Sequence, residues 1–579
     1  MFDGNKITHT PKRVCVILHL KNDNGVSDMK SVYLINGGMD ADAFGILSGT
    51  CEKELARRGV KTDARDGYGI RVAVDPSLAN DTFRLLPGSD GAAVSGATLS
   101  AVFHGVGVLL RRLKPDGRGG FTPLAEAVTF TPVKPLRGMY FATHFGNFYH
   151  AAPIEEVLER VVLSAMRGYN ELLVWFDMHH FASMEDPEAV ALTERLHTVL
   201  QYANRVGMGA SILMLANEGF SSSPVSLRAR FEVENGYQKV PLGHYGCEIC
   251  PSVPGGVEEI LRERREMLAK FADLRMDYVI LWPYDQGGCT CHACAPWGGN
   301  GYLRLLPHCR ALLNELMPNA KIIVSTWLFD SFTDGEWDAF AKAAQGDADA
   351  FAGVDCFMAS AVPEKVAQST SLRWISFPEI SMAKCAPWGG FGASVLTERL
   401  QERLVPELAH MEGGFPYSEG IFEDANEFIV AGLYTGEFAD AQSALRAYVE
   451  WEFCCADEAL YKAVLDTEVG LKRESHGNRA PFRILNPEKV TEVAQVLERY
   501  RKTLPEPIAT GRTFRLLYLR SVVDEELIAH DGDPLASGRS VAALEEIDRI
   551  YHVTDTTSVW VRTPVWRLHP EANPEHCAV

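Results

Sequence analysis

The feature that most constrains the fold of this chain is a repeated alternation that begins at Pro135. Eight short apolar runs, each ending in polar or aromatic residues, alternate with stretches whose apolar residues recur at helical spacing. The runs are LRGMYFATHF, YNELLVWFDM, GASILMLANE, DYVILWPYDQ, KIIVSTWLFD, VDCFMASAV, LRWISFPEIS and GGFPYSEGIF. Alternating β and α segments in this number predict a closed parallel (β/α)8 barrel of the TIM type inside a ring of helices.

Different patterns flank the barrel segment. Before it, the short β-type runs RVCVILHL, SVYLING and YGIRVAV alternate with helical pieces, of which the clearest follows Thr98. After it, ADAQSALRAYVEWEF, PEKVTEVAQVLERYRKTL and GRSVAALEEIDRIYH have helical patterns, and TTSVWVRTPVW suggests short β pieces. We predict an α/β chain with a small α/β accessory domain at 1–133, the catalytic barrel at 134–436 and a mainly helical C-terminal region at 437–579.

Charge and composition limit the partners of the chain. The formal net charge of −20 argues against nucleic acid or an anionic membrane as the main partner, because both attract clustered Lys and Arg. The start of the chain has no apolar segment typical of a secretory signal, and no apolar run elsewhere is long enough to span a bilayer. We therefore expect a cytoplasmic protein with a soluble ligand, and the sequence is compatible with a homo-oligomer.

The ends of the predicted strands carry the candidate site, because catalytic groups of barrel enzymes come from the carboxyl ends of the strands. Glycosidic cleavage needs one carboxyl group to protonate the leaving oxygen and a second to act at the anomeric carbon. Aromatic faces can then hold the apolar side of a sugar. The strand ends supply both kinds of side chain: His144, Asp177, Glu218, Tyr284, Asp285, Trp327, Glu379, Tyr417 and Glu419, with Trp388 in the loop after strand seven.

Within this set, the carboxylates Asp177 and Glu218 and the imidazole of His144 are predicted to bind sugar hydroxyls, and the aromatic residues to bind the ring. A salt bridge at the barrel rim is the plainer alternative for the two carboxylates. His144, His179 and His180 could suggest a metal centre, but the two adjacent histidines at one strand end are expected to point to opposite sides. No phosphate-binding loop, serine elbow or HExxH motif occurs, so we expect catalysis without a cofactor.

Two parts of the chain resemble carbohydrate-active families. DGYGI at 66–70, then Ser95-Gly96-Ala97 and a helix from Thr98, resembles the accessory domain that precedes the barrel in family 20 hexosaminidases and family 67 α-glucuronidases. WPYDQGGCTCHACAPWGGNGYL, with CPS at 250–252 and FPYSEGIFED at 415–424, resembles glycoside hydrolase families 20, 67 and 163. The resemblance spans residues 60–435 and implies a glycosidase.

One departure from the family 20 pattern bears on mechanism. Family 20 enzymes carry an adjacent Asp-Glu pair after strand four, whose Asp orients the substrate acetamido group, whereas Asp285 is followed by Gln286. We therefore expect two carboxylates to carry the reaction. Many retaining barrel glycosidases place the acid/base after strand four and the nucleophile after strand seven. By this resemblance Asp285 is the general acid, Glu379 the nucleophile or base, and Glu419 the second candidate for either role.

The predicted activity is hydrolysis of an O-glycosidic bond of an amino sugar, an N-acetylhexosamine. An α-glucuronidase or sialidase would need a cation facing the sugar carboxylate, and Arg137 and Arg373 both sit at strand starts, which favours a neutral sugar. A catalytically inactive barrel that binds or senses carbohydrate is the alternative from another class. A lyase or isomerase on the same barrel is a third, because the fold hosts many chemistries.

A group of cysteines surrounds predicted strand four. Cys247-x2-Cys250 precedes it and Cys289-x-Cys291-x2-Cys294 follows it, a spacing that fits a tetrahedral thiolate site. A structural zinc held by Cys250, Cys289, Cys291 and Cys294 would fix the loop that carries Asp285. Free thiols and a local disulfide are the alternatives.

Overall fold

The computed structural model describes residues 31–62, 67–144, 146–231, 246–285, 287–346, 351, 353–360, 362–363, 372–381, 391–476 and 479–552 of the 579-residue chain. RVCVILHL, Trp388 and TTSVWVRTPVW lie outside these residues. Among the described residues, no helix is both long and apolar enough to cross a bilayer.

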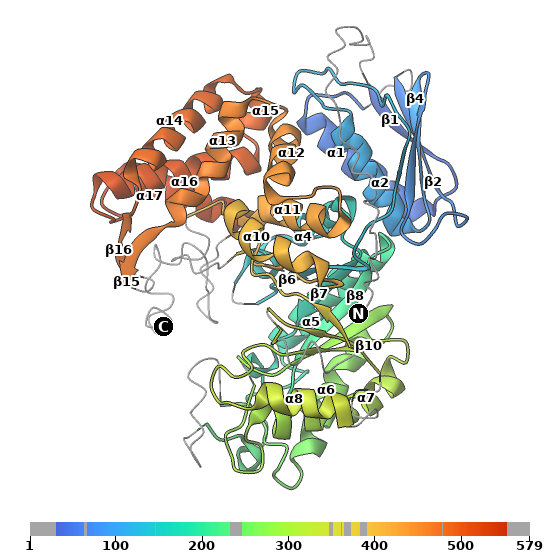
Figure 1. The fold of residues 1–579 in the computed structure, drawn as a ribbon, viewed down its shortest axis with the longest axis vertical. Helices are drawn as coiled ribbons and strands as arrows, with labels where there is room; N and C mark the ends of the chain where they lie inside the picture. Colours follow the sequence, from blue (N-terminus) through green and yellow to red (C-terminus); the bar gives the residue numbers. More distant parts are fainter. Residues whose placement is uncertain are drawn as a thin grey trace, which may run out of the picture.

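The N-terminal part is a five-stranded mixed sheet with two helices on the side that faces the rest of the molecule (Figure 1). Its elements are β1 (Val32–Asn36), α1 (Ala41–Arg57), β2 (Tyr68–Val74), β3 (Phe83–Gly88), β4 (Gly91–Gly96), α2 (Leu99–Arg112) and β5 (Val128–Phe130), with sheet order β1-β2-β4-β3-β5. The helix expected after Thr98 is present, and the Thr98 hydroxyl caps it by accepting from the Ala101 N–H at 3.1 Å. A Cβ on Gly107 would lie 1.9 Å from the Met166 carbonyl oxygen, so this glycine lets α2 pack closely on the barrel.

All eight predicted strands are observed as parallel strands of one sheet. They are β6 (Leu136–Phe141), β7 (Glu171–Trp175), β8 (Gly209–Leu215), β9 (Met276–Trp282), β10 (Lys321–Ser325), β11 (Val354–Met358), β12 (Arg373–Ile375) and a split eighth strand, β13 (Gly413–Gly414) with β14 (Tyr417–Ser418). The eighth strand pairs with β6 on one side. On the other side, bridges from Ser376 and Glu379 join the β12 segment to Gly414 and Tyr417. The parallel sheet is therefore consistent with the expected TIM-like domain, and its eighth strand lies beside the first.

Helices cover the outside of the barrel. They are α3 (Phe148–Ala151), α4 (Ile154–Arg167), α5 (Pro187–Arg205), α6 (Gly256–Leu268), α7 (Leu303–Leu316), α8 (Glu336–Gly346), α10 (Thr397–Arg403) and α11 (Asp424–Thr435). Short turns of helix lie between them, namely η1 (Met178–His180), η2 (Val225–Leu227), η3 (Ala269–Phe271), η4 (Gly298–Tyr302), η5 (Val405–Ala409) and η6 (Ile421–Glu423), and a further turn, η7 (Thr467–Leu471), follows in the C-terminal part. Residues 154–167 form a helix because their apolar side chains recur on one face, and Gly168 ends it in the left-handed conformation at φ +100°.

The described C-terminal part is mainly helical. It comprises α12 (Ala441–Phe453), α13 (Glu458–Asp466), the hairpin of β15 (Arg473–His476) and β16 (Arg479–Ile484), α14 (Pro487–Thr503), α15 (Glu506–Ala509), α16 (Arg512–Ala529) and α17 (Gly538–Tyr551). In Figure 1 these helices lie at the upper left, and α12 stands between them and the N-terminal part, where Arg57 of α1 pairs with Glu452 at 2.9 Å. At the end of α17, the Tyr551 hydroxyl donates to the Glu419 carbonyl oxygen at 2.7 Å. This last described helix therefore contacts the carboxyl end of strand eight.

Candidate active site at the carboxyl ends of the barrel strands

Aromatic rings fill the barrel interior beneath the strand ends. The rings of Tyr140 and Tyr417 meet edge to face with centroids 5.2 Å apart. Phe377 lies 5.9 Å from Tyr417 and 5.0 Å from Trp282, and Trp282 lies 5.7 Å from Trp327. These side chains belong to one buried cluster inside the strands. They give the mouth of the barrel an apolar floor of the kind that packs against a sugar ring.

Carboxylates surround the two tyrosines of this floor. Burial raises the pKa of Tyr140 well above its usual value, and the charges of Asp177 and Asp285 raise it further. Burial likewise raises the pKa of Tyr417, followed by the charge of Glu419 and, among smaller effects, that of Glu379. Carboxyl groups from strands two, four, seven and eight thus act on one pair of touching rings, so the barrel brings together residues that are far apart in sequence.

Asp285 lies in a turn that follows strand four of the barrel, β9. Its Oδ2 accepts a hydrogen bond of 2.9 Å from the indole N–H of Trp327, which follows strand five, and the side chain is half-buried. Its backbone adopts the left-handed conformation at φ +70°, which Asp tolerates better than most residues. Asp285 is therefore held by its neighbour while it remains accessible from the mouth.

Glu419 at the end of strand eight is more deeply placed, with 1% of its surface exposed. The hydroxyl of Tyr417 donates to Glu419 Oε1 at 3.0 Å and lies 3.3 Å from His144 Nε2. The backbone N–H groups of Glu419 and Gly420 donate to Glu423 Oε2 at 3.2 and 2.8 Å. Glu419, Tyr417 and His144 therefore form one polar chain across strands one and eight.

Glu379 follows strand seven and is half-buried. It forms a parallel bridge with Tyr417, and the Tyr417 N–H donates to the Pro378 carbonyl oxygen at 3.0 Å. Residues paired in this way present their side chains to the same side of a sheet. Tyr417 belongs to the interior cluster, so the pairing places Glu379 on the interior side, next to the tyrosine that bonds Glu419.

The two histidines after strand two do not point to opposite sides, and that expectation is wrong. Residues 178–180 form the 3-10 turn η1, in which side chains advance by a third of a turn per residue. The rings of His179 and His180 are 4.0 Å apart, and His180 Nε2 lies 3.1 Å from Asp177 Oδ2. Asp177, His179 and His180 each offer a ligand atom, and these atoms lie within 4.8 Å of one another. The two adjacent histidines are evident in the sequence, but the sequence pattern predicts the end of a strand where the chain forms a 3-10 turn.

Glu218 lies behind His179. Its Oε1 is 2.6 Å from His179 Nδ1 and also accepts the His179 backbone N–H at 3.1 Å. Burial raises the pKa of Glu218 to about 8 and lowers the pKa of His179 to about 3. Both groups are therefore neutral near pH 7, and Glu218 orients the imidazole.

One residue of the predicted set, Tyr284, lies away from the interior floor. Its hydroxyl donates to Glu336, the fully buried first residue of α8, and its ring packs edge to face on Phe332. Trp388 falls outside the described residues. The floor residues Tyr140 and Phe377 are not in the predicted set, because Tyr140 lies within β6 and Phe377 precedes the polar residues that follow β12. The two-residue period of each run could have identified them.

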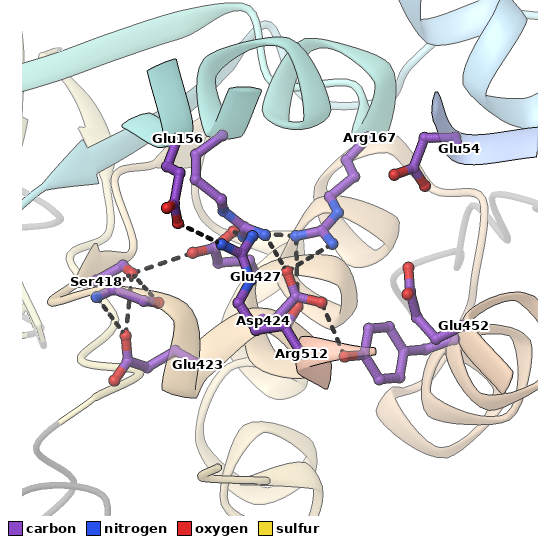
Figure 2. A network of polar contacts seen from close by, with 12 residues as sticks. Glu54, Glu156, Arg167, Ser418, Glu423, Asp424, Glu427, Glu452 and Arg512 are labelled. Atoms are coloured by element: carbon purple, nitrogen blue, oxygen red, sulfur yellow. Dashed lines mark hydrogen bonds and ion pairs between the residues drawn. The ribbon is translucent and has the colours of Figure 1, made fainter. Parts of the chain in front are cut away.

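A buried network of charges supports the strand-eight side of the mouth. Figure 2 shows Arg167 of α4 reaching Asp424 and Glu427 of α11, at 2.8 and 3.0 Å. Arg160, also on α4, pairs with the same two carboxylates. Ser418 donates to Glu427 at 3.1 Å and so ties the network to strand eight. Asp424 lies in the first turn of α11, and these guanidinium groups are its ion-pair partners.

The predicted metal ligands come together on the strand-four side. Cys250, Cys289, Cys291 and Cys294 place their sulfur atoms within 4.8 Å of one another. Cys247, the fifth thiol of the group, is not among them, and its sulfur lies 3.9 Å from the His179 carbonyl oxygen. Asn217 also connects these two loops, because its amide donates to the Ile249 and Gly288 carbonyl oxygens at 3.0 and 2.8 Å.

Comparison by sequence finds no matching family model and no matching curated protein. Comparison of the fold finds solved glycoside hydrolases. A family 89 enzyme from Clostridium perfringens in complex with its substrate GlcNAc-α-1,4-galactose is 12% identical, with a TM-score of 0.54, over 83% of this chain and 60% of that one. The chain thus spans about 60% of the length of that relative.

Two further similar structures cover most of their own chains. A family 138 enzyme targeting the pectin rhamnogalacturonan II is 10% identical, with a TM-score of 0.53, over 94% of this chain and 91% of that one. A family 20 β-N-acetylhexosaminidase from Streptomyces coelicolor A3(2) is 12% identical, with a TM-score of 0.50, over 72% and 90%. The chain therefore shares the fold of these glycoside hydrolases, as its sequence resemblance implied.

Proposed function

We propose that this chain is a glycoside hydrolase that cleaves the O-glycosidic bond of an N-acetylhexosamine at the mouth of its barrel. Asp285 protonates the leaving oxygen, and Glu379 attacks the anomeric carbon or activates a water there. Glu419 is the second candidate for either role. The observation that carries the proposal is that carboxyl groups from three strands meet one interior aromatic cluster: Asp285 bonds Trp327, Glu419 bonds Tyr417, and Glu379 is paired with Tyr417.

The assignment of roles rests on how each carboxyl group is held. Asp285 is half-buried and accepts the Trp327 indole N–H, which orients its carboxyl group toward a glycosidic oxygen in the mouth. Glu379 lies on the same interior side beside Tyr417. Glu419 is engaged by Tyr417 and almost fully buried, which suits a group that orients the tyrosine as well as one that reacts.

Side chains around the carboxylates can bind the sugar. Aromatic faces at Trp327 and Tyr417 offer a surface for the apolar side of the ring. Asp177 and His180, paired at 3.1 Å, and His144 offer polar atoms for hydroxyl or acetamido groups. The proposed reaction needs no cofactor, because carboxyl groups of the chain supply the acid and the nucleophile.

An N-acetylated neutral sugar is favoured over an acidic one. Arg137 donates to the Gly168 carbonyl oxygen at 2.7 Å and pairs with Asp81, and Arg373 pairs with Asp355. Both guanidinium groups belong to strand starts and already have acidic partners, so neither suits a sugar carboxylate at the strand ends. Two similar structures support the amino sugar: the family 89 enzyme was solved with GlcNAc-α-1,4-galactose, and the family 20 enzyme is a β-N-acetylhexosaminidase.

A hydrolysis screen tests the proposal. The purified chain is assayed against aryl α- and β-glycosides of N-acetylhexosamines, glucuronic acid, sialic acid and neutral hexoses. We expect cleavage of an N-acetylhexosaminide, and a rate at least about 100-fold lower for Glu379→Gln. Glu402→Gln, which changes an exposed glutamate on α10, should match the wild type. Cleavage of an acidic glycoside alone would overturn the substrate assignment. An inert chain that still binds the sugars would favour the binding barrel.

A further inference from the structure

Four thiols from two loops meet beside the active-site mouth, at the outer side of strand four. Cys250 lies just before α6, whereas the other three follow strand four within the turn that begins at Asp285. The Cys250 sulfur is 3.6 Å from that of Cys289, and 3.8 Å from those of Cys291 and Cys294. Cys250, Cys289 and Cys294 are almost fully buried, and Cys291 is partly exposed.

These distances match the edges of a metal-centred tetrahedron. Zinc–thiolate bonds of about 2.3 Å arranged tetrahedrally separate the sulfur atoms by about 3.8 Å. A disulfide would require about 2.05 Å instead. A disulfide would join one pair and does not account for one sulfur at a similar distance from three others, whereas a shared central ion does.

The surroundings of the sulfur atoms suit thiolates. The backbone N–H groups of Ser252 and Cys291 point at the sulfurs of Cys250 and Cys289, two residues earlier in each loop. The Ser252 hydroxyl lies 3.1 Å from the Cys294 sulfur, and Arg304 donates to that hydroxyl at 3.4 Å. Such donors offset the negative charge that four thiolates leave on a divalent ion.

We propose that Cys250, Cys289, Cys291 and Cys294 bind one structural zinc ion that joins the loop before α6 to the turn carrying Asp285. Binding releases the thiol protons and forms four zinc–sulfur bonds without oxidation or reduction. All four positions are filled by the chain, so the ion has no open site for catalysis and acts by holding backbone.

The loops around the zinc site are also tied by hydrogen bonds. Asn217 bonds the Gly288 N–H and carbonyl oxygen, each at 2.8 Å, and the Thr290 N–H donates to the Arg230 carbonyl oxygen at 2.7 Å. The Trp297 indole donates to the Pro283 carbonyl oxygen at 2.7 Å. Asp285 thus lies inside a segment fixed at both ends. This positioning effect rests on the proposed function, whereas the zinc site does not.

Metal analysis of the full chain tests the site without any substrate. Protein produced with zinc in the medium should contain about one zinc per chain, measured by plasma mass spectrometry. Cys289→Ser and Cys294→Ser should lose most of it. Cys247→Ser, in the same loop but outside the cluster, and Cys309→Ser, a buried thiol on α7, should keep the wild-type content.

A second measurement covers the case in which the cluster variants fail to fold. Titration of the wild-type chain with a mercurial should release the zinc to a chelating dye as the cluster thiols are modified. A zinc-free, folded wild type with freely reactive cluster thiols would overturn the proposal. So would a disulfide among the four cysteines, or iron in place of zinc. Each of these results is independent of whether the chain cleaves a glycoside.

Discussion

Strand eight and strand four each present a carboxyl group at the barrel mouth, but the side chains that support the two strands differ in charge. Behind strand eight, two arginines of α4 and two carboxylates of α11 form buried ion pairs (Figure 2). Behind strands three and four, the supports are the Asn217 amide, four thiols and the neutral His179–Glu218 pair. One side is therefore held by guanidinium–carboxylate pairs, and the other by an uncharged amide, a neutral imidazole–carboxyl pair and a group of thiols.

Two buried carboxyl groups, one on each side, have pKa values shifted in opposite directions. Burial alone would raise the pKa of Asp424, but the guanidinium groups of Arg167 and Arg160 outweigh it and lower that pKa well below the usual range. Glu218 is also buried, and there the attraction of Arg264 does not outweigh burial, so its pKa rises to about 8. Asp424 stays ionised and Glu218 stays protonated at neutral pH.

The largest expected effect comes from breaking the charged side. Arg160→Met leaves Asp424 and Glu427 buried with one guanidinium group fewer, and removing one partner of a buried pair costs about 3–5 kcal/mol of unfolding free energy. Arg262→Met provides the control, because Arg262 is 49% exposed and its pairs on α6 are worth less than about 1 kcal/mol. Urea unfolding followed by tryptophan fluorescence measures both. Equal losses would contradict the ion-pair account.

A smaller effect should appear in the unfolding free energy: the contributions of Glu218 and Asp424 to it should change with pH in opposite directions. Glu218 binds its proton up to about pH 8 when folded, but only to about pH 4.5 when unfolded. The folded state therefore holds the extra proton in this window, and the stability of wild type relative to Glu218→Gln falls as pH rises through it, by a few kcal/mol. The contribution of Asp424, whose pKa is depressed, is instead present above about pH 4 and lost on acidification.

Unfolding of wild type and Glu218→Gln near pH 5 and near pH 8 measures this difference. If the gap between the two proteins does not change with pH, Glu218 is not held in its protonated form.

The smallest expected effect is confined to the strand-four side. Trp327→Phe keeps an aromatic ring near Trp282 and Phe377 but removes the indole bond to Asp285. Loss of one hydrogen bond to a charged group is worth about 1.5–3 kcal/mol, so kcat/KM on the cleaved glycoside should fall about 10- to 100-fold. Trp337→Phe, in the outer wall against Phe329, should leave the rate unchanged. An unchanged rate in Trp327→Phe would separate Asp285 from its proposed partner.

Local patterns in the sequence predict the barrel well, because each strand is a continuous apolar run that ends where the site begins. The four clustered cysteines were also identifiable, since their spacing alone fits a metal site. The charged support could not be found in this way. Arg160 and Glu427 are 267 residues apart, and nothing near either residue indicates the other. The orientation of the His179 and His180 side chains was also not predicted, because the apolar run indicates a strand up to these residues and the chain forms a 3-10 turn there.

The central claim of the proposed mechanism is that Asp285 is the general acid. The sensitivity of the hydrolysis rate to the leaving group tests this role directly. Asp285→Asn is compared with wild type on two glycosides of the same sugar, one with a poor leaving group and one with a dinitrophenol that departs without protonation. We predict a loss of at least about 100-fold on the first and less than about 10-fold on the second. Equal losses on both substrates, or none on either, would contradict the proposed mechanism.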